Sequence, residues 1–197
     1  MAERYGLRNK RRDGVRDEMW NSVNIYGPQA EIERFKQLCI VPVSEDEPPN
    51  RTLAMDFERI IPTPVGAEIE LVRRFKAWDT SENAWNFRAS ENQERGTYSF
   101  AFDTIGRFPV PIFRRLAELF PTLAFECDCI EECDESMGYG WFNTPDGGDD
   151  FFDGYDVPDG YWEMGEPIKR DTMAELRHRA LVARITQTVR EAHADDA

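Results

Sequence analysis

Two strand-like segments of this chain are each followed by a helix-like segment, and this order constrains the fold more than any other feature. Apolar and polar residues alternate over 20–27, and apolar side chains recur at helical spacing over 29–38. The same succession returns at 97–103 and 109–120, where prolines stand at the start of the helical segment. Each amphipathic helix is expected to pack its apolar stripe onto a sheet.

Further segments complete the pattern. Residues 53–61 and 123–130 read as strands, and 138–142 as a fifth strand that extends the sheet, while a short helix is expected around 68–77. The order of the main elements is then β-α-β-β-α-β, the split βαβ arrangement. The sequence therefore predicts an α+β fold, a ferredoxin-like sandwich whose antiparallel sheet carries two helices on one face.

The predicted sandwich occupies residues 20–143 and carries additions. Residues 1–19 are a polar, locally basic arm, and residues 63–96 are an insertion between two strands. Residues 144–197 hold an acidic, aromatic loop and then a C-terminal helix over 173–192. Connections longer than about 15 residues usually carry structure or function of their own, so the additions are candidates for the functional site.

The excess negative charge is confined to one part of the chain. The net charge is −14, from 38 acidic and 24 basic residues. Between Leu116 and Ile168 there are 15 acidic residues and no lysine or arginine, so the rest of the chain is close to neutral. Because nucleic-acid-binding surfaces need basic residues to contact phosphates, the sequence predicts that this region does not bind nucleic acid directly.

Acidic and aromatic side chains alternate in the segment that follows residue 143. Aromatic residues framed by charge are typical of protein-binding surfaces, where they contribute most of the affinity. Dense carboxylates can also compete with duplex DNA for a basic groove. One plainer alternative is that the aromatic side chains fold back as a lid over the face of the sheet opposite the helices, while the aspartates remain solvated. Another is irregular cation binding or substrate binding, although the spacing of an EF-hand is not met. The predicted partner-binding residues are Asp149, Asp150, Phe151, Phe152, Asp153, Tyr155, Asp156, Asp159, Tyr161 and Trp162.

The sequence assigns no catalytic residue, no metal site and no cofactor. The cluster Cys127-x-Cys129-x-x-x-Cys133 lacks the usual Cys-x-x-Cys spacing of structural zinc sites. On a strand, the first two of these cysteines share one face and can serve as small apolar side chains. The only histidines, His178 and His193, lie far away near the C-terminus.

The expected location is the cytoplasm. No apolar run approaches the ~20 residues that a membrane span requires, and the first ten residues lack the apolar region of a secretory signal. The cysteines are therefore expected to stay reduced.

Several residue strings resemble the Api92-like family, small proteins of phages and plasmids with a C-terminal ferredoxin-like domain. The strings are NSVNIYG at 21–27, EIERFK at 31–36, MDFERIIP at 55–62, FDT at 102–104, PVPI at 109–112, LAELFP at 116–121 and MGYG at 137–140. The resemblance covers roughly residues 20–142. It implies the fold and a mobile-element origin, and it supplies no catalytic residues.

The sequence departs from the family pattern at three places. One is the family's middle tryptophan cluster, which is only loosely echoed by Trp78 and Trp85. Met19-Trp20 stand where the family tends to carry Trp-Cys, and Gly106-Arg107-Phe108 stand where it tends to carry tryptophan. The acidic stretch after residue 143 and the last helix lie outside the resemblance.

Two functional hypotheses follow. The first is a non-enzymatic phage or plasmid protein that binds a basic, nucleic-acid-handling host protein through its acidic segment, as an anti-defence inhibitor or DNA mimic. The second is an enzyme or small-molecule-binding protein in which the 63–96 insertion forms a pocket wall. Its candidate pocket residues are Trp78, Trp85 and Asp103.

Overall fold

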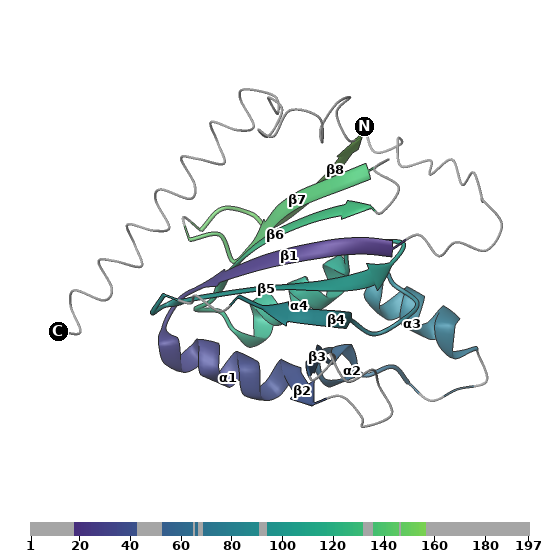
Figure 1. Ribbon diagram of the computed structural model, residues 1–197, viewed down its shortest axis with the longest axis horizontal. Coiled ribbons are helices and arrows are strands. Elements are labelled where there is room, and N and C mark those ends of the chain that lie inside the picture. The colour runs from purple at the N-terminus through teal and green to yellow at the C-terminus, as the bar shows by residue number, and fades with distance from the viewer. Residues whose placement is uncertain are drawn as a thin grey trace.

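A six-stranded antiparallel sheet forms the centre of the computed structural model (Figure 1). The structure describes residues 18–42, 53–64, 66, 69–90, 94–131, 136–145 and 147–156. In sheet order, the strands are β4 (Trp85–Ala89), β5 (Thr97–Ile105), β1 (Glu18–Tyr26), β6 (Ala124–Glu131), β7 (Ser136–Phe142) and β8 (Phe151–Asp156). Every neighbouring pair is antiparallel.

Four helices accompany the sheet in the described part of the chain, which makes the fold a mixed α+β one. They are α1 (Gln29–Cys39), α2 (Phe57–Ile60), α3 (Glu70–Trp78) and α4 (Val110–Leu119). A second, two-stranded sheet is formed by β2 (Ile40–Pro42) and β3 (Leu53–Met55). No helix among the described residues is long and apolar enough to cross a membrane.

The core lies between the sheet and helices α1 and α4. Phe35 of α1 is fully buried, and its ring contacts those of Phe100 on β5 and Phe125 on β6. Phe113 of α4 contacts the ring of Phe125 and that of Phe142 on β7. Such aromatic pairs contribute about 0.5–1.5 kcal/mol each beyond the burial of their area.

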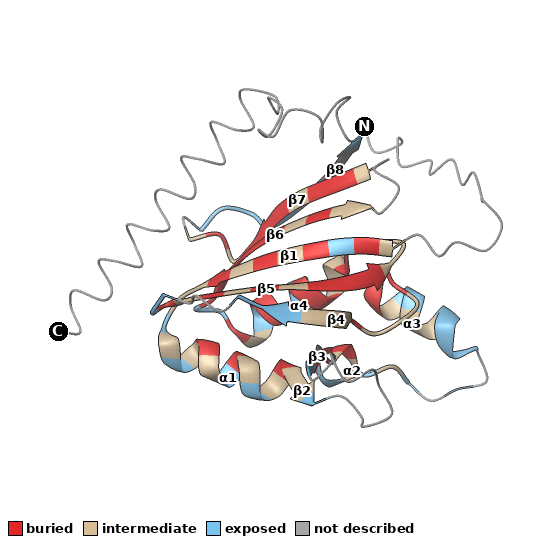
Figure 2. Ribbon diagram, viewed as in Figure 1, coloured by how far each residue is buried: buried red, intermediate tan, exposed pale blue. Residues whose placement is uncertain are grey.

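Alternation along β1 decides which side chains face the helices. Met19, Asn21, Val23 and Ile25 are buried on the helix side. The residues between them point to the opposite side of the sheet, which we call the open face, because successive strand residues project in opposite directions. Figure 2 shows the resulting mixture of buried and partly exposed positions along the central strands.

The prediction of a strand over 53–61 is wrong in its second half. The strand β3 ends at Met55, and the helix α2 begins at Phe57. Asp56 caps this helix, since its side chain accepts a hydrogen bond from the backbone N–H of Glu58 at 3.1 Å. The strand predicted from the β-branched residues at 60 and 61 does not form, because this cap starts a helix after Asp56 instead.

The insertion supplies a strand to the main sheet. The short helix expected around 68–77 is confirmed as α3, and β4 follows it and pairs with β5. The sheet position beside β5 is therefore taken by β4, whereas residues 53–55 form β3 of the second sheet. The strands expected at 20–27, 97–103, 123–130 and 138–142 and the helices expected at 29–38 and 109–120 are confirmed as β1, β5, β6, β7, α1 and α4. The C-terminal helix expected over 173–192 lies outside the described residues.

Candidate functional site

The acidic, aromatic segment begins as the outermost strand of the sheet. β8 pairs with β7 on one side, and its other side meets no strand in the described part of the chain. This position is at the opposite end of the sheet from β4 (Figure 1). A strand was not predicted here, because the glycines and aspartates of this segment are depleted in strands.

The structure places seven of the ten predicted partner-binding residues. Those on or immediately before β8 are Asp149, Asp150, Phe151, Phe152, Asp153, Tyr155 and Asp156. The side chain of Tyr155 is not described. The remaining predictions, Asp159, Tyr161 and Trp162, lie outside the described residues.

Phe152 anchors β8 to the rest of the fold. Its ring lies parallel to that of Phe108, with centroids 4.2 Å apart and an interplanar angle of 11°. The side chain packs against the main hydrophobic core and is half-buried. The alternative in which aromatic side chains of this segment cover the open face does not hold for Phe152, whose ring packs on the helix side of the sheet.

Two glycines of β7 make room for this ring. A Cβ atom at Gly138 would lie 2.6 Å from Cε1 of Phe152, and a Cβ atom at Gly140 would lie 2.6 Å from the Cα atom of the same residue. Both distances are well below van der Waals contact. Glycine within a strand often marks such a close approach of another segment.

The turn that leads into β8 is held by side-chain hydrogen bonds. The backbone N–H of Asn143 donates to Oδ1 of Asp150 at 2.7 Å. The side-chain amide of Asn143 donates to the carbonyl oxygens of Ala117 at 2.8 Å and Phe120 at 3.0 Å, near the end of α4. Asn143 has a φ of 52°, a left-handed conformation that asparagine tolerates better than most residues.

The carboxylates of this segment point into solvent. Asp149, Asp150, Asp153 and Asp156 are all exposed, and we call this group the acidic edge. Phe151 lies among them with 36% of its surface exposed. Exposed carboxylates beside an exposed aromatic ring can attract and contact a cationic surface.

A buried carboxylate lies next to the acidic edge on the open face. Glu126 of β6 accepts hydrogen bonds from the amide of Asn24 at 3.2 Å, the hydroxyl of Tyr26 at 2.9 Å and the hydroxyl of Tyr139 at 3.2 Å. Trp141 in turn donates its indole N–H to the Tyr139 hydroxyl. Burial raises the pKa of Tyr26, and the negative charge of Glu126 raises it further. This network holds the open-face side chains of β1, β6 and β7 in place, next to β8.

A second buried carboxylate belongs to the alternative pocket. Asp103 accepts a hydrogen bond from the side-chain amide of Asn86 at 2.6 Å. It also forms an ion pair with Arg88 at 3.1 Å. Trp85 is its partner across β4 and β5. The register of β4 shifts between residues 85 and 88, and Asn86 has a φ of 51°. A β-bulge therefore directs both Asn86 and Arg88 toward Asp103.

Trp78, the third residue of the alternative pocket, lies elsewhere. It is fully buried, and its indole N–H donates to the carbonyl oxygen of Ile61 at 2.9 Å. Its ring contacts Phe57, which in turn contacts Phe102 on the helix side of β5. The next residue, Asp103, points to the open face. The structure thus brings Trp85 and Asp103 together and places Trp78 in the core.

The cysteines of β6 lie in the core. Cys127 and Cys129 are buried, as is Cys39 of α1. Burial raises the pKa of Cys39 and of Cys129 to about 12. Raised pKa values disfavour the thiolate, which is the form that attacks electrophiles and binds metals. Cys133 lies outside the described residues.

No family model, curated protein or solved structure matches this chain. The acidic edge is therefore the main indication of function. The resemblance to the Api92-like family stays a prediction carried by its residue strings.

Sequence reasoning missed the residues that hold the acidic edge in place. The anchoring pair Phe108 and Phe152 is 44 positions apart in sequence and has no local pattern. A usable signal is the Gly-x-Gly spacing of Gly138 and Gly140 within an otherwise aromatic strand, since it indicates a close neighbour. Glu126 was also missed, although it shares the open face with Tyr139 by register.

Proposed function

We propose that this protein binds a basic partner protein through the acidic edge. The observation that carries the proposal is that four exposed carboxylates and the ring of Phe151 lie together at the rim of the sheet, with Asp149 and Asp150 just before β8 and Asp153 and Asp156 on it. Aromatic anchors among charged residues are typical of binding surfaces. Complementary charge also speeds the encounter with a partner.

The concrete version of this proposal is an inhibitor of a nucleic-acid-handling host protein. A basic groove that normally holds DNA, which carries about one charge per 1.7 Å of helix axis, would accept a dense row of carboxylates. The resemblance to phage and plasmid proteins supports a role against host defence, in the cytoplasm of a bacterial cell. No chemical step is required of the chain in this role.

We also propose that the scaffold is ferredoxin-like. The order β4-β5-β1-β6 places β1 between β5 and β6, which are joined through α4. This is the interleaving expected of a split βαβ unit. The strands β7 and β8 then extend such a core and present the acidic edge at its rim.

The carboxylates of the acidic edge could also serve only to keep β8 from aggregating, and a test must distinguish this role from partner binding. Charged side chains on an edge strand prevent it from pairing with strands of other molecules. A purely protective role requires negative charge but no specific partner. The experiment must therefore compare partner capture rather than solubility.

The test uses an edge variant and a control variant of the full chain. The edge variant carries Asp149→Asn, Asp150→Asn, Asp153→Asn and Asp156→Asn; Asn keeps the acceptor that the backbone N–H of residue 143 uses. The control variant carries Glu31→Gln, Glu33→Gln, Glu94→Gln and Glu118→Gln. Both remove four negative charges from surface positions, so they differ in where the charge is lost.

Each protein is immobilised and exposed to a bacterial host lysate at low and high salt. A partner that is captured by the wild-type protein and the control variant, and lost with the edge variant, supports the proposal. Retention of the same partners by the edge variant contradicts it. Loss of the partner at high salt is expected as well, because screening weakens contacts between exposed charges.

The alternative of a small-molecule pocket rests on one observation. Asp103 is buried beside Trp85 and is held by Asn86 and Arg88 through a bulged strand. Bulges are over-represented next to active sites. If Asp103 lines a ligand pocket, Asp103→Asn removes ligand binding, whereas the edge variant leaves ligand binding unchanged.

A further inference from the structure

The helix α3 exposes an apolar stripe that no described part of the chain covers. Ile69, immediately before the helix, has 70% of its surface exposed, and Leu71, Val72 and Phe75 have 49%, 41% and 43% exposed. Only three other large hydrophobic side chains of the described residues are exposed, and they are scattered over β1, β3 and β8. Contiguous exposed apolar surface of this kind marks interaction sites more often than isolated residues do.

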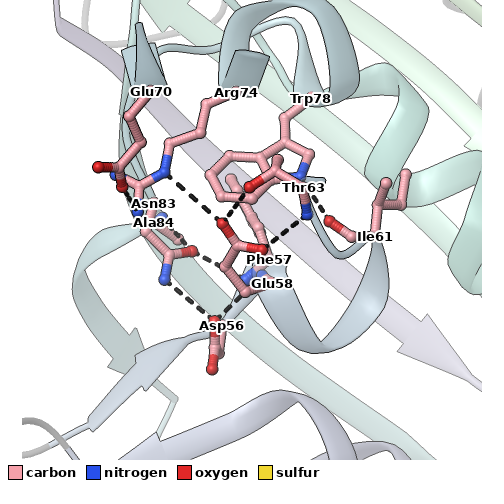
Figure 3. A network of polar contacts seen from close by, with 10 residues as sticks. All are labelled: Asp56, Phe57, Glu58, Ile61, Thr63, Glu70, Arg74, Trp78, Asn83 and Ala84. Atoms are coloured by element: carbon pink, nitrogen blue, oxygen red, sulfur yellow. Dashed lines mark hydrogen bonds and ion pairs between the residues drawn. The ribbon is translucent and has the colours of Figure 1, made fainter. Parts of the chain in front are cut away.

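The stripe faces outward because the opposite side of α3 is fixed to α2 (Figure 3). Arg74 forms ion pairs with Glu70 at 2.5 Å and with Glu58 at 3.7 Å. Glu58 also accepts hydrogen bonds from the backbone N–H of Thr63 at 2.8 Å and from its hydroxyl at 2.6 Å. The buried Trp78 closes the end of the helix. The orientation of α3 is therefore determined by the fold, and Figure 2 shows its outer surface as exposed.

Basic side chains outnumber acidic ones on and beside α3. They are Arg73, Arg74, Lys76 and Arg107, against Glu70 and Asp79. The guanidinium of Arg107 lies 5.7 Å from the centre of the Phe75 ring. Lys76 is exposed on α3, and Arg73 donates a hydrogen bond to the carbonyl oxygen of Gly66 at 2.8 Å. In a chain whose net charge is −14, this is a local reversal of sign beside an apolar surface.

We propose that α3 is a docking surface for an acidic amphipathic segment of a partner protein. Apolar side chains of that segment would bury Leu71, Val72 and Phe75, and its carboxylates would meet Arg107 and Lys76. An amphipathic segment laid along an apolar surface with matching charges at its sides is a common mode of peptide recognition. The proposal is independent of the acidic edge, which has the opposite charge and lies on another part of the sheet.

Charge complementarity distinguishes this occupant from two others. In a symmetric pair of this chain, the same patch faces itself, so Arg107 and Lys76 would approach the basic side chains of the second copy. An anionic membrane is a wide surface and would also meet the acidic remainder of the molecule. A peptide segment contacts the patch alone, and charges farther than about 8 Å away are largely screened at physiological salt.

The test measures binding of two synthetic peptides to the full chain by fluorescence anisotropy. Both are about 18 residues long, enough for a marginally stable helix, and carry leucine along one face. The first has glutamate on the remaining positions, and the second has lysine there. The acidic peptide is expected to bind at least about tenfold more tightly than the basic one, which corresponds to about 1.4 kcal/mol.

Variants locate the site. Val72→Ser with Phe75→Ser is expected to weaken binding of the acidic peptide at least about tenfold, since hydrophobic anchors dominate such contacts. Leu53→Ser, which alters an equally exposed leucine on β3, serves as the matched control and should leave binding unchanged. Lys76→Glu with Arg107→Glu should reverse the preference between the peptides, whereas Arg95→Glu with Arg115→Glu should not.

Several results would overturn the proposal. Equal affinity for the two peptides, or undiminished binding by the serine variant of α3, would show that the stripe does not select an acidic segment. So would binding to phosphatidylglycerol vesicles without binding to the acidic peptide. Self-association that disappears in the serine variant would assign the stripe to a second copy instead. Circular dichroism of each variant confirms that the fold is retained.

Discussion

The ring of Phe152 on β8 lies flat against the ring of Phe108, with centroids 4.2 Å apart. Phe108 lies two residues before α4, so this contact joins the strand that carries the acidic edge to the helix layer. The acidic edge is therefore part of the folded sheet. Its carboxylates are held at the rim of the sheet by this strand, which is the property that the proposed function requires.

Removal of this contact should detach β8. We expect Phe152→Ala to lower the free energy of unfolding by about 2–3 kcal/mol, slightly less than a fully buried Phe→Ala substitution, because the ring is half-buried. Phe151→Ala, at the exposed neighbour, should change it by less than about 0.5 kcal/mol. Urea denaturation of both variants measures the difference, and equal effects would show that Phe152 is not the anchor.

The two glycines under Phe152 provide an independent test of the same arrangement. Gly140→Ala should displace β8, because the new Cβ atom would overlap the backbone of Phe151 and Phe152. Amide hydrogen exchange along β7 should then become faster on the side that pairs with β8. Gly66→Ala is the control, since its nearest atom lies 3.9 Å away. Unchanged protection of β7 in Gly140→Ala would contradict the close approach.

Buried thiols and phenols should make the protein sensitive to alkali. The pKa values of Cys39 and Cys129 are raised from 9.0 to about 12, and that of Tyr98 from 10.0 to about 12, mainly by burial. The unfolded chain loses these protons near the ordinary values while the folded chain keeps them. Stability is therefore complete below about pH 9 and is lost as the pH rises toward 12.

Urea denaturation at about pH 8 and about pH 10.5 tests this dependence. The free energy of unfolding should be lower at the higher pH. Absorbance titration of tyrosine should show that one folded-state tyrosine, Tyr98, ionises near pH 12 rather than near 10.0. Ionisation of all six tyrosines at their ordinary pKa in the folded protein would contradict the burial of Tyr98.

Asp79 should weaken the end of α3 at neutral pH. It has a φ of 64°, and burial raises its pKa above 3.8 despite the attraction of Arg107 and Arg114. A raised pKa means that the folded state disfavours the carboxylate, so stability falls as the pH rises through this range. We expect Asp79→Asn to gain a few tenths of a kcal/mol at neutral pH, with no gain at about pH 3.

Thermal unfolding at both pH values measures this gain. Asparagine tolerates the left-handed conformation as well as aspartate does, so the comparison isolates the charge. Asp79→Ala should be less stable at both pH values, because alanine disfavours that conformation. A loss of stability in Asp79→Asn at neutral pH would mean that the arginines outweigh burial.

Most of the sheet could be predicted because its pattern is local. Alternation along β1 and β5 and the helical spacing in α1 reflect which face of each element is buried, and these periods are visible within about ten residues. The strand predicted over 53–61 failed because one capping residue, Asp56, outweighs a β-branched run. A cap acts through a single hydrogen bond and leaves no period in the sequence.

The candidate site could be predicted in composition but not in structure. The carboxylates near residue 150 are evident in the sequence, whereas their support depends on the contact of Phe152 with Phe108 and the space above Gly138. These contacts join segments that are far apart along the chain. The separation of Trp78 from Asp103 has the same origin, since the two lie on opposite sides of β5.

The affinity of the captured partner for the edge variant tests the central claim most directly. Isothermal titration of the purified partner should give a dissociation constant at least about tenfold weaker for the edge variant than for the wild-type protein, as expected when exposed charges at a binding surface are neutralised. The control variant, with the same net charge, should bind as the wild-type protein does. Equal dissociation constants for the edge variant and the wild-type protein would contradict the claim that the acidic edge is the binding site.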